Sequence, residues 1–281
     1  MKIAIIGAGT MGSGITQTII SANYDTLLIS DSEASIEKGI ELINLGFNKA
    51  IVKGKLTVEQ KKSYLSHLKT SINMNDLREA EIVIEAVPED IDIKRKVLMK
   101  IENVVGLKTI IATNTSSISI TSLSNVLNTP NRFIGMHFFN PAPVMKLIEI
   151  VKGEHTSTLT VDAAITFGES LGKTAVKVMD FPGFISNRIL MAYINESINA
   201  LDQGVATVNA IDTIAKLGFN HPMGPLELAD FIGLDVCKDI MDAIYMQNKD
   251  QKFIPAPSLV KLVNDKKLGR KTGNGFYDYK S

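Results

Sequence analysis

The chain has 281 residues, 45% of them hydrophobic, and its 30 basic and 30 acidic residues give a formal net charge of zero. This length allows two domains with buried cores, whereas the balanced charge and the lack of an apolar run long enough to span a bilayer argue against nucleic acid or a membrane as a partner. Because Cys237 is the only cysteine, no disulfide can form within the chain, and we expect a cytoplasmic protein.

The first residues have the pattern of a nucleotide-binding turn. Residues 2–6 are rich in β-branched side chains, which is typical of a buried parallel strand. Gly7, Gly9 and Gly12 follow with the spacing G-x-G-x-x-G and open an amphipathic helical segment. Residues without a Cβ permit this tight turn, and the free N–H groups at the start of the helix can bind a pyrophosphate.

Asp31 stands at the end of a second predicted strand, residues 27–30. A carboxylate about twenty residues past the glycines accepts both ribose hydroxyls of an adenosine, whereas a 2′-phosphate would meet its negative charge. The combination therefore predicts NAD as the cofactor in preference to NADP. The alternative is a glycine-rich turn in an α/β protein that binds no nucleotide.

The following segments alternate between helix and strand. Residues 33–70 have the periodicity of two helices joined near residues 54–57, and strands at 81–87 and 109–113 flank a helix at 91–104. This alternation predicts an α/β fold with a Rossmann-type, doubly wound and mostly parallel sheet. Ligands bind at the carboxyl ends of such strands, where we expect Pro88, Glu89, Asn114 and Ser116.

The composition changes at residues 180–183, which contain a Pro-Gly pair. Before this segment the sequence predicts strands at 133–139, 146–151 and 174–179 and a helix at 159–171. Beyond it only helical patterns remain, at 185–203, 208–217, 225–247 and 258–265. We therefore expect an α/β domain over residues 1–183, followed by an all-α domain over residues 184–281.

His137 and Glu149 are candidates for proton transfer. They lie in consecutive predicted strands, and an acid in the apolar setting of Glu149 needs a partner. If the strands are neighbours, the carboxylate can hold one ring nitrogen and leave the other for proton transfer. The alternatives are a satisfied core histidine and a half-exposed glutamate on an edge strand. None of the four histidines pairs with another at metal-ligand spacing, so we predict no metal site.

Other polar residues have weaker patterns. Ser116 and Asn187 occupy positions, a strand end and the start of a helix, where capping is common. Lys49 and Lys53 belong to a basic cluster with helical periodicity, which is typical of a solvated helix face.

Several segments together resemble the 3-hydroxyacyl-CoA dehydrogenases. They are GAGTMGSGI at 7–15, NTSS at 114–117, GMHFFNPAPVMKLIEI at 135–150, PGFISNRIL at 182–190, HPMGPLELADFIGLD at 221–235 and GRKTGNGFYDY at 269–279. The resemblance covers essentially the whole chain, and it is greatest for the short bacterial members, the 3-hydroxybutyryl-CoA dehydrogenases. Within it, HFFNP and HPMGP are specific to the family.

The resemblance implies roles for individual residues. His137 matches the catalytic histidine and Glu149 its carboxylate partner, while Ser116 and Asn187 match residues that contact the substrate oxygen. Lys49 and Lys53 match lysines that bind the phosphates of coenzyme A, and Glu89 and Lys94 match positions near the nicotinamide and its ribose. The implied cofactor-binding set is Gly7, Gly9, Thr10, Met11, Gly12, Asp31, Glu89, Lys94 and Asn114.

The implied activity is reversible hydride transfer between NAD and carbon 3 of a short-chain 3-hydroxyacyl-CoA, as in the interconversion of 3-hydroxybutyryl-CoA and acetoacetyl-CoA. It belongs to fatty acid or butanoate metabolism. The resemblance also implies a homodimer, or a higher homo-oligomer, formed through the helical domain.

Two other functions fit parts of the sequence. A β-hydroxyacid dehydrogenase acts on a free acid. Enzymes of that class resemble one another in having a lysine four residues before a helix asparagine, but in this chain Gly183 lies four residues before Asn187. A non-catalytic NAD-binding structural protein would not need a proton-transfer pair, and His137 and Glu149 are both present.

Overall fold

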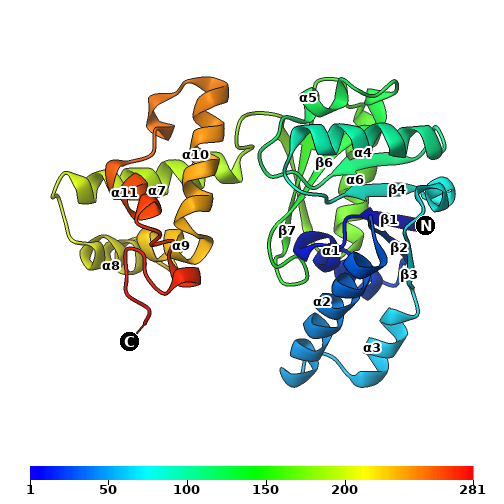
Figure 1. Cartoon of the computed structure of the whole chain (residues 1–281), viewed down its shortest axis with the longest axis horizontal. Coiled ribbons are helices and arrows are strands. Elements are labelled where there is room, and N and C mark those ends of the chain that lie inside the picture. Colours follow the sequence, from blue (N-terminus) through cyan, green and yellow to red (C-terminus); the bar gives the residue numbers. More distant parts are fainter. Residues whose placement is uncertain (281) are drawn as a thin grey trace. The chain divides into compact units, whose positions relative to one another are not determined.

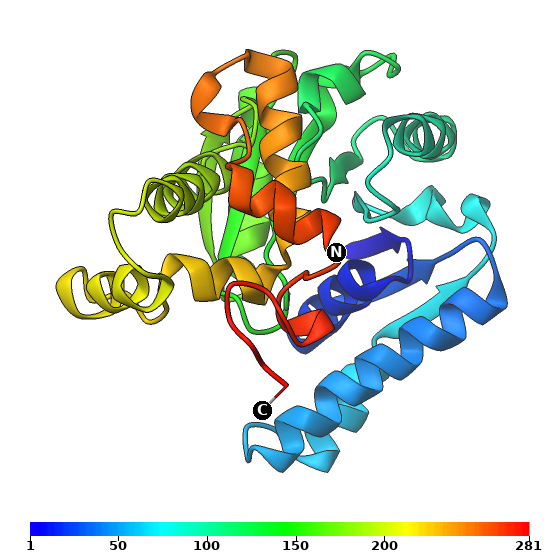
Figure 2. The same cartoon turned by 60° about the vertical axis from the view of Figure 1, so that its left-hand side comes forward.

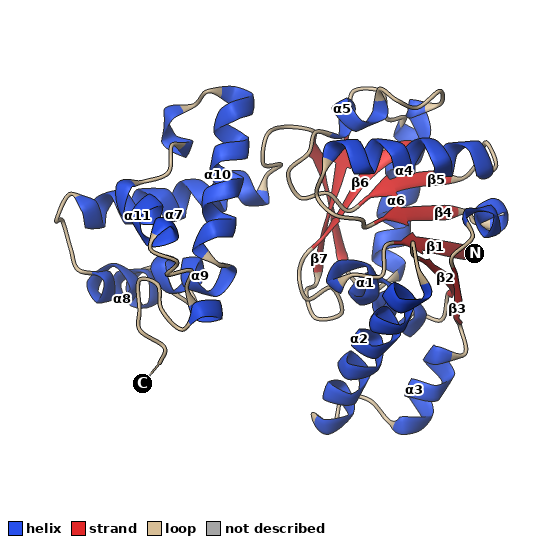
Figure 3. Ribbon diagram, viewed as in Figure 1, coloured by secondary structure: helices blue, strands red, loops and turns tan. Residues whose placement is uncertain are grey.

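The computed structural model describes residues 1–280, which form two compact units. The first unit is Met1–Asp180 and the second begins at Phe181, whereas the boundary predicted from the sequence follows residue 183. The strands of the sheet all belong to the first unit (Figures 1 and 3). Within residues 1–280 no helix is both long and apolar enough to cross a membrane.

An eight-stranded sheet forms the centre of the first unit. Its spatial order is β3 (Leu68–Ser71), β2 (Asp25–Ile29), β1 (Lys2–Ile6), β4 (Ile82–Glu85), β5 (Ile110–Thr113), β6 (Phe133–Phe138), β7 (Leu147–Lys152) and β8 (Thr174–Met179). Every neighbouring pair is parallel except β6 and β7, which are antiparallel. The predicted α/β class with a mostly parallel sheet is confirmed.

Helices cover both faces of this sheet. They are α1 (Thr10–Ser21), α2 (Glu33–Val52), α3 (Val58–Leu65), α4 (Ile91–Val104), α5 (Ile120–Ser124) and α6 (Thr158–Ser170). Apolar residues of α1 and α6 join one core cluster with alternate strand residues, and α2 packs on α1 (Figure 2). Leu98 and Ile101 of α4 are buried outside that cluster, which places α4 on the opposite face.

The sequence does not predict strand β3, because all of its residues except Ser71 fall inside the segment 33–70, which has helical periodicity. Its sequence LKTS has no buried residue, since β3 lies at the edge of the sheet and pairs only with β2. An edge strand without an inward apolar face lacks the alternation that identifies strands in a sequence.

The second unit contains α7 (Ser186–Asp202), α8 (Val208–Gly218), α9 (Pro225–Ile232), α10 (Leu234–Asn248) and α11 (Pro257–Asn264). Their apolar faces form one core that includes Met191, Ile194, Leu226 and Met241. The single helix predicted over residues 225–247 is wrong. Gly233 has a φ of +109° and ends α9, and this conformation is available to glycine but not to the residues around it.

Two buried aspartates tie the C-terminal segment to these helices. Asp212 accepts hydrogen bonds from the N–H of Leu226 (2.9 Å) and the hydroxyl of Tyr277 (2.7 Å). Asp230 accepts the N–H groups of Phe276 (3.0 Å) and Tyr277 (2.9 Å). Burial raises the pKa of Asp230 above its ordinary value; the hydrogen bonds oppose this shift, and the nearby charge of Asp212 adds to it.

Replacing Asp230 with asparagine should change how stability depends on pH. Since folding raises the pKa of Asp230, this carboxyl contributes stability that is fully present below 3.8 and is lost as the pH rises through the raised value. The Asp230→Asn variant has no titratable group at this position. Its free energy of unfolding minus that of the wild type should therefore increase with pH across this window, by at most about 1.4 kcal/mol per pH unit.

Urea denaturation of both proteins at several pH values between acid and neutral measures this difference. The loss of one acceptor oxygen in the Asp230→Asn variant adds an offset that does not depend on pH, so the slope is the informative quantity. A difference that stays constant across the series contradicts the raised pKa.

Candidate active site

His137 and Glu149 are direct partners across the only antiparallel step of the sheet among the described residues. The register of β6 and β7 places them opposite each other, and 2.8 Å separates Nδ1 of His137 from Oε2 of Glu149. The two residues are 6% and 1% exposed. With Glu149 ionised, the ring donates from Nδ1, and Nε2 is the nitrogen that can exchange a proton with a substrate.

The alternation of the two strands decides which face this pair occupies. The residues that flank the pair belong to the core cluster beneath α1 and α6: Met136, Phe138, Ile148 and Ile150. Successive strand residues point to opposite faces, so His137 and Glu149 point to the face of α4. Because β7 lies between β6 and β8, Glu149 does not occupy the half-exposed edge position that was its alternative interpretation.

The three glycines of the first turn have different environments. Gly7 has a φ of +106°, and a Cβ there would lie 2.6 Å from the carbonyl oxygen of Ala86. A Cβ at Gly12 would lie 1.7 Å from the oxygen of Gly7. At Gly9 a Cβ would meet no atom within 4 Å. Gly7 and Gly12 are therefore required by the turn itself, whereas Gly9 borders open space.

That open space lies at the N-terminus of α1. Gly9 is the N-cap and its position provides no side-chain hydrogen bond, while Thr10 and Met11 begin the helix. The first N–H groups of a helix have no partner within it, and the helix dipole favours an anion there. The turn therefore fits the pyrophosphate of a dinucleotide.

Asp31 follows β2 and is exposed. Because β2 runs parallel to β1, Asp31 lies at the same edge of the sheet as the glycine turn. A hydrogen bond from the hydroxyl of Ser35 (3.0 Å) lowers the pKa of the Asp31 carboxyl. The carboxylate is therefore ionised at neutral pH and accepts hydrogen bonds. Among residues 1–280 no basic side chain forms an ion pair with it, and this fits ribose hydroxyls better than a 2′-phosphate.

Asn114 connects β5 to the strand that carries His137. Its side-chain oxygen accepts the N–H of Phe138 at 2.9 Å. Ser116 is not a helix cap; the N-cap of α5 is Ser119, whose side chain accepts the N–H of Ser122.

Glu89 organises the serine loop, which we define as residues 115–117. Its Oε1 accepts the N–H groups of Ser116 (2.9 Å) and Ser117 (3.0 Å) and the hydroxyl of Thr115 (2.6 Å). Burial would raise the pKa of Glu89, but the positive charge of Lys94 and these hydrogen bonds lower it overall. The structure thus brings Glu89, Lys94 and Ser116 into one cluster.

Sequence reasoning missed Glu85, which anchors this cluster. Glu85 ends β4, is fully buried, and lies 2.8 Å from the ammonium of Lys94. The signal was present, because a glutamate inside the apolar run EIVIEAV needs a partner for the same reason as Glu149.

The remaining predicted residues lie elsewhere. Lys49 is in the last turn of α2 and Lys53 is its C-cap; both are exposed, and no carboxylate of residues 1–280 forms an ion pair with either. Asn187 lies in the first turn of α7, in the second unit. No group of three or more His, Cys, Asp or Glu in the described chain could hold a metal ion.

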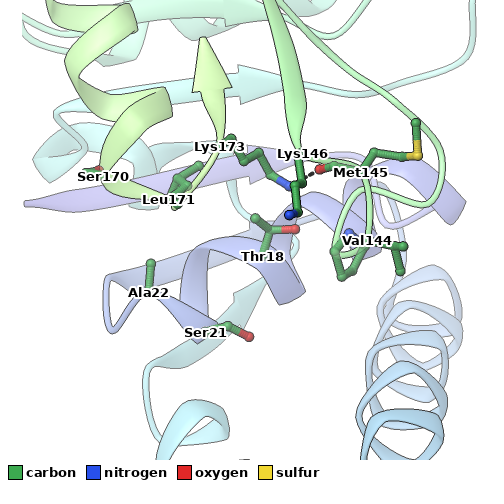
Figure 4. Close-up of a pocket in the computed structure, with 11 residues that line it drawn as sticks. Thr18, Ser21, Ala22, Val144, Met145, Lys146, Ser170, Leu171 and Lys173 are labelled. Atoms are coloured by element: carbon green, nitrogen blue, oxygen red, sulfur yellow. Dashed lines mark hydrogen bonds between the residues drawn. The ribbon is translucent and has the colours of Figure 1, made fainter. Parts of the chain in front are cut away.

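A cavity of about 470 Å³ lies beside α1 and the loop between β6 and β7 (Figure 4). Lys173 is buried there, and its ammonium donates to the carbonyl oxygens of Ala142 (2.7 Å) and Met145 (2.6 Å). Burial lowers the pKa of Lys173. None of the predicted site residues lines this cavity, so Lys173 holds the loop that joins the two site strands without belonging to the site.

Comparison with known proteins identifies the family. Residues 2–181 match the NAD binding domain of 3-hydroxyacyl-CoA dehydrogenase, and residues 183–279 match its C-terminal domain. The chain is 45% identical over 279 residues to the 3-hydroxybutyryl-CoA dehydrogenase of Clostridioides difficile, covering 99% of both chains. It is 44% identical over 278 residues to the probable 3-hydroxybutyryl-CoA dehydrogenase of Bacillus subtilis, covering 99% of this chain and 97% of that one.

A solved structure is equally similar. The (S)-3-hydroxybutyryl-CoA dehydrogenase of Ralstonia eutropha superposes with a TM-score of 0.96 at 44% identity, covering 100% of this chain and 99% of that one. The predicted cofactor, NAD, and the predicted class, an oxidoreductase that acts on a CH–OH group, are confirmed. The chain belongs to the 3-hydroxyacyl-CoA dehydrogenase family.

Proposed function

We propose that this protein is an NAD-dependent 3-hydroxybutyryl-CoA dehydrogenase of fatty acid or butanoate metabolism in the cytoplasm. The observation that carries the proposal is the buried hydrogen bond of 2.8 Å between His137 and Glu149. The names of the relatives at 45% and 44% identity support the short-chain CoA thioester as substrate. When bound, NAD would supply the hydride acceptor for carbon 3 of the hydroxyacyl group, and NADH would supply the hydride donor for the ketone in the reverse direction.

His137 is the general base of the oxidative direction. Its Nε2 takes the proton of the substrate hydroxyl, and Glu149 stabilises the imidazolium that forms. In the reductive direction the same imidazolium gives its proton to the oxygen of the ketone. Glu149 also fixes the ring orientation through Nδ1, because the two residues are held by the register of their strands.

Ser116 and Asn187 donate hydrogen bonds to the reacting oxygen. Their contribution is greatest when negative charge develops on that oxygen, since preformed donors then need no reorganisation. Ser116 belongs to the first unit and Asn187 to the second.

The first unit binds the cofactor. The N–H groups that follow Gly9 bind the pyrophosphate, and Asp31 accepts the ribose hydroxyls of the adenosine. Glu89 and Lys94 would lie near the nicotinamide and its ribose, and Asn114 would also contact the cofactor. Gly9 leaves space for the phosphates, because a Cβ there would meet no atom within 4 Å. A Cβ at Gly7 or Gly12 would instead meet backbone atoms of the protein.

Lys49 and Lys53 bind the phosphates of coenzyme A. They are exposed, lie one helical turn apart, and form no ion pair with a carboxylate among the described residues. A polyanionic ligand can therefore pair with both lysines without first breaking an ion pair within the protein.

The second unit binds the acyl substrate and forms a homodimer or higher homo-oligomer. Several large apolar side chains of this unit are exposed: Ile189 62%, Leu217 82%, Phe219 61%, Phe231 59% and Met246 67%. Such side chains are typical of a subunit interface where they form one contiguous apolar patch.

Acetoacetyl-CoA should be reduced at the expense of NADH, and free acetoacetate should be a poor substrate. Lys49→Gln and Lys53→Gln should each raise KM for acetoacetyl-CoA by about threefold to tenfold with little change in kcat, because each removes uniform binding of the phosphates. Lys62→Gln, an exposed lysine of α3, is the matched control. Equal activity on free acetoacetate favours a β-hydroxyacid dehydrogenase, and no activity on either favours a structural protein.

His137→Gln should lower kcat by about 10² to 10⁴ and leave the dissociation constant of NADH nearly unchanged, because it removes the proton-transfer group but no cofactor contact. Glu149→Gln should also lower kcat, since a neutral amide does not stabilise the imidazolium. His155→Gln changes an exposed histidine outside the site and controls for the substitution itself. A His137→Gln enzyme with near-normal turnover would overturn the assignment.

Gly9→Ala should weaken NADH binding about tenfold or more without lowering the melting temperature. The added methyl group meets no protein atom within 4 Å but occupies space that we assign to the pyrophosphate. Gly12→Ala should destabilise the protein, because its Cβ would lie 1.7 Å from a backbone oxygen. Gly106→Ala, at a distant loop position with room for a methyl group, is the control. NADH fluorescence and thermal unfolding give the two readouts, and unchanged NADH affinity in Gly9→Ala contradicts the placement.

A further inference from the structure

Glu85 occupies an unusual position for an acidic residue. It ends the central strand β4, between Ile6 of β1 and Thr113 of β5, and it is 0% exposed. Ile82 and Ile84 of the same strand belong to the core cluster beneath α1 and α6, so Glu85 points to the face that His137 and Glu149 also occupy.

Both carboxylate oxygens of Glu85 are engaged. Oε1 accepts the N–H of Val87 (2.7 Å) and the ammonium of Lys94 (2.8 Å). Oε2 accepts the hydroxyl of Thr113 (2.6 Å). Lys94 itself is 1% exposed. A buried ion pair pays a desolvation cost that its attraction often fails to recover, so stability alone is a weak reason for its presence.

The network continues from Lys94 to the serine loop. The ammonium of Lys94 also donates to the carbonyl oxygen of Val87 (3.3 Å) and lies 3.4 Å from Oε2 of Glu89. The other oxygen of Glu89 accepts the N–H of Ser116 at 2.9 Å. A continuous series of contacts therefore runs from the buried end of β4 to the residue that we assign to the substrate oxygen.

We propose that Glu85 is a positioning residue of the reaction, which acts through Lys94 and Glu89 on the serine loop. The inference rests on the proposed function, because Ser116 receives its role there. The charge of Glu85 holds Lys94 between two carboxylates. Without that charge Lys94 has one carboxylate partner and shifts toward it, and Glu89 then no longer holds Ser116 where a hydrogen bond to the substrate oxygen is formed. Small displacements of such donors cost rate.

Glu85→Gln is the direct test, because it keeps the shape of the side chain and removes its charge. With acetoacetyl-CoA and saturating NADH, kcat should fall about tenfold to a hundredfold. Glu102→Gln is the matched control: Glu102 is a carboxylate of α4 with a 7% exposed side chain, 3.8 Å from Arg132, and it has no contact with the serine loop among the described residues. It should lower the melting temperature while kcat remains within about twofold.

A double variant separates positioning from general destabilisation. If Glu85 acts through Ser116, Ser116→Ala removes the group that Glu85 positions, and Glu85→Gln should then cause little further loss of kcat. If Glu85 only stabilises the fold, the losses of the two single variants multiply. Multiplying losses, or a Glu85→Gln enzyme that loses stability but keeps its kcat, overturn the proposal.

Thr113→Val provides the same test should Glu85→Gln fold poorly. It removes the hydrogen bond to Glu85 and also the one that the Thr113 hydroxyl accepts from the N–H of Thr115 (3.3 Å), and it leaves both buried charges in place. Its kcat should fall a few-fold in the wild-type background and remain unchanged in the Ser116→Ala background; a fall in both backgrounds contradicts the proposal. A wild-type protein without activity on acetoacetyl-CoA refutes the proposed function instead, so the two failures are distinguished.

Discussion

The antiparallel pairing of β6 and β7 is the constraint on which the site depends. Among the described strands it is the single reversal in an otherwise parallel sheet, and its register sets His137 opposite Glu149. A slip of one residue would send one member of the pair to the opposite face, into the core beneath α1 and α6. Ile148 and Ile150 prevent this, because their burial in that core fixes the register. The packing of the apolar core and the hydrogen bond between His137 and Glu149 are therefore two consequences of one alignment.

The same face of the sheet holds a second pair of ionisable groups, Glu85 and Lys94. In β4, β6 and β7 an ionisable side chain replaces an apolar one at a position that faces α4, and each is matched by a hydrogen-bonding partner of suitable charge. Unpaired, any of these groups would cost several kcal/mol to bury. The partners come from different elements, a neighbouring strand for His137 and a helix for Glu85, so the completed fold is required to satisfy them.

The sequence predicts what depends on local pattern. The helix at 91–104 and the strand at 174–179 have the predicted bounds. The helix has buried residues at helical spacing, whereas the strand has no buried residue and is predicted from the β-branched residues of its sequence TAVKVM. Local pattern does not predict two features of the fold. The sequence of β3, LKTS, has a single β-branched residue and no buried one, and the periodicity of residues 225–247 continues through Gly233, whose φ of +109° breaks the helix. The pairing of β3 with β2 and the backbone conformation of Gly233 cannot be recognised from the composition of either segment.

The residues of the candidate site also differ in whether local sequence pattern is enough to recognise them. Gly9 and Asp31 can be recognised from spacing, since the turn, helix and strand that place them are consecutive. Ser116 cannot, because Glu89, which holds it, lies 27 residues earlier in the chain. Glu85 is intermediate: an acid in an apolar strand indicates a partner but does not name it. Charge buried in a strand is thus a local signal for a non-local contact, and among the described residues of the first unit both strands that contain a buried glutamate carry residues of the candidate site.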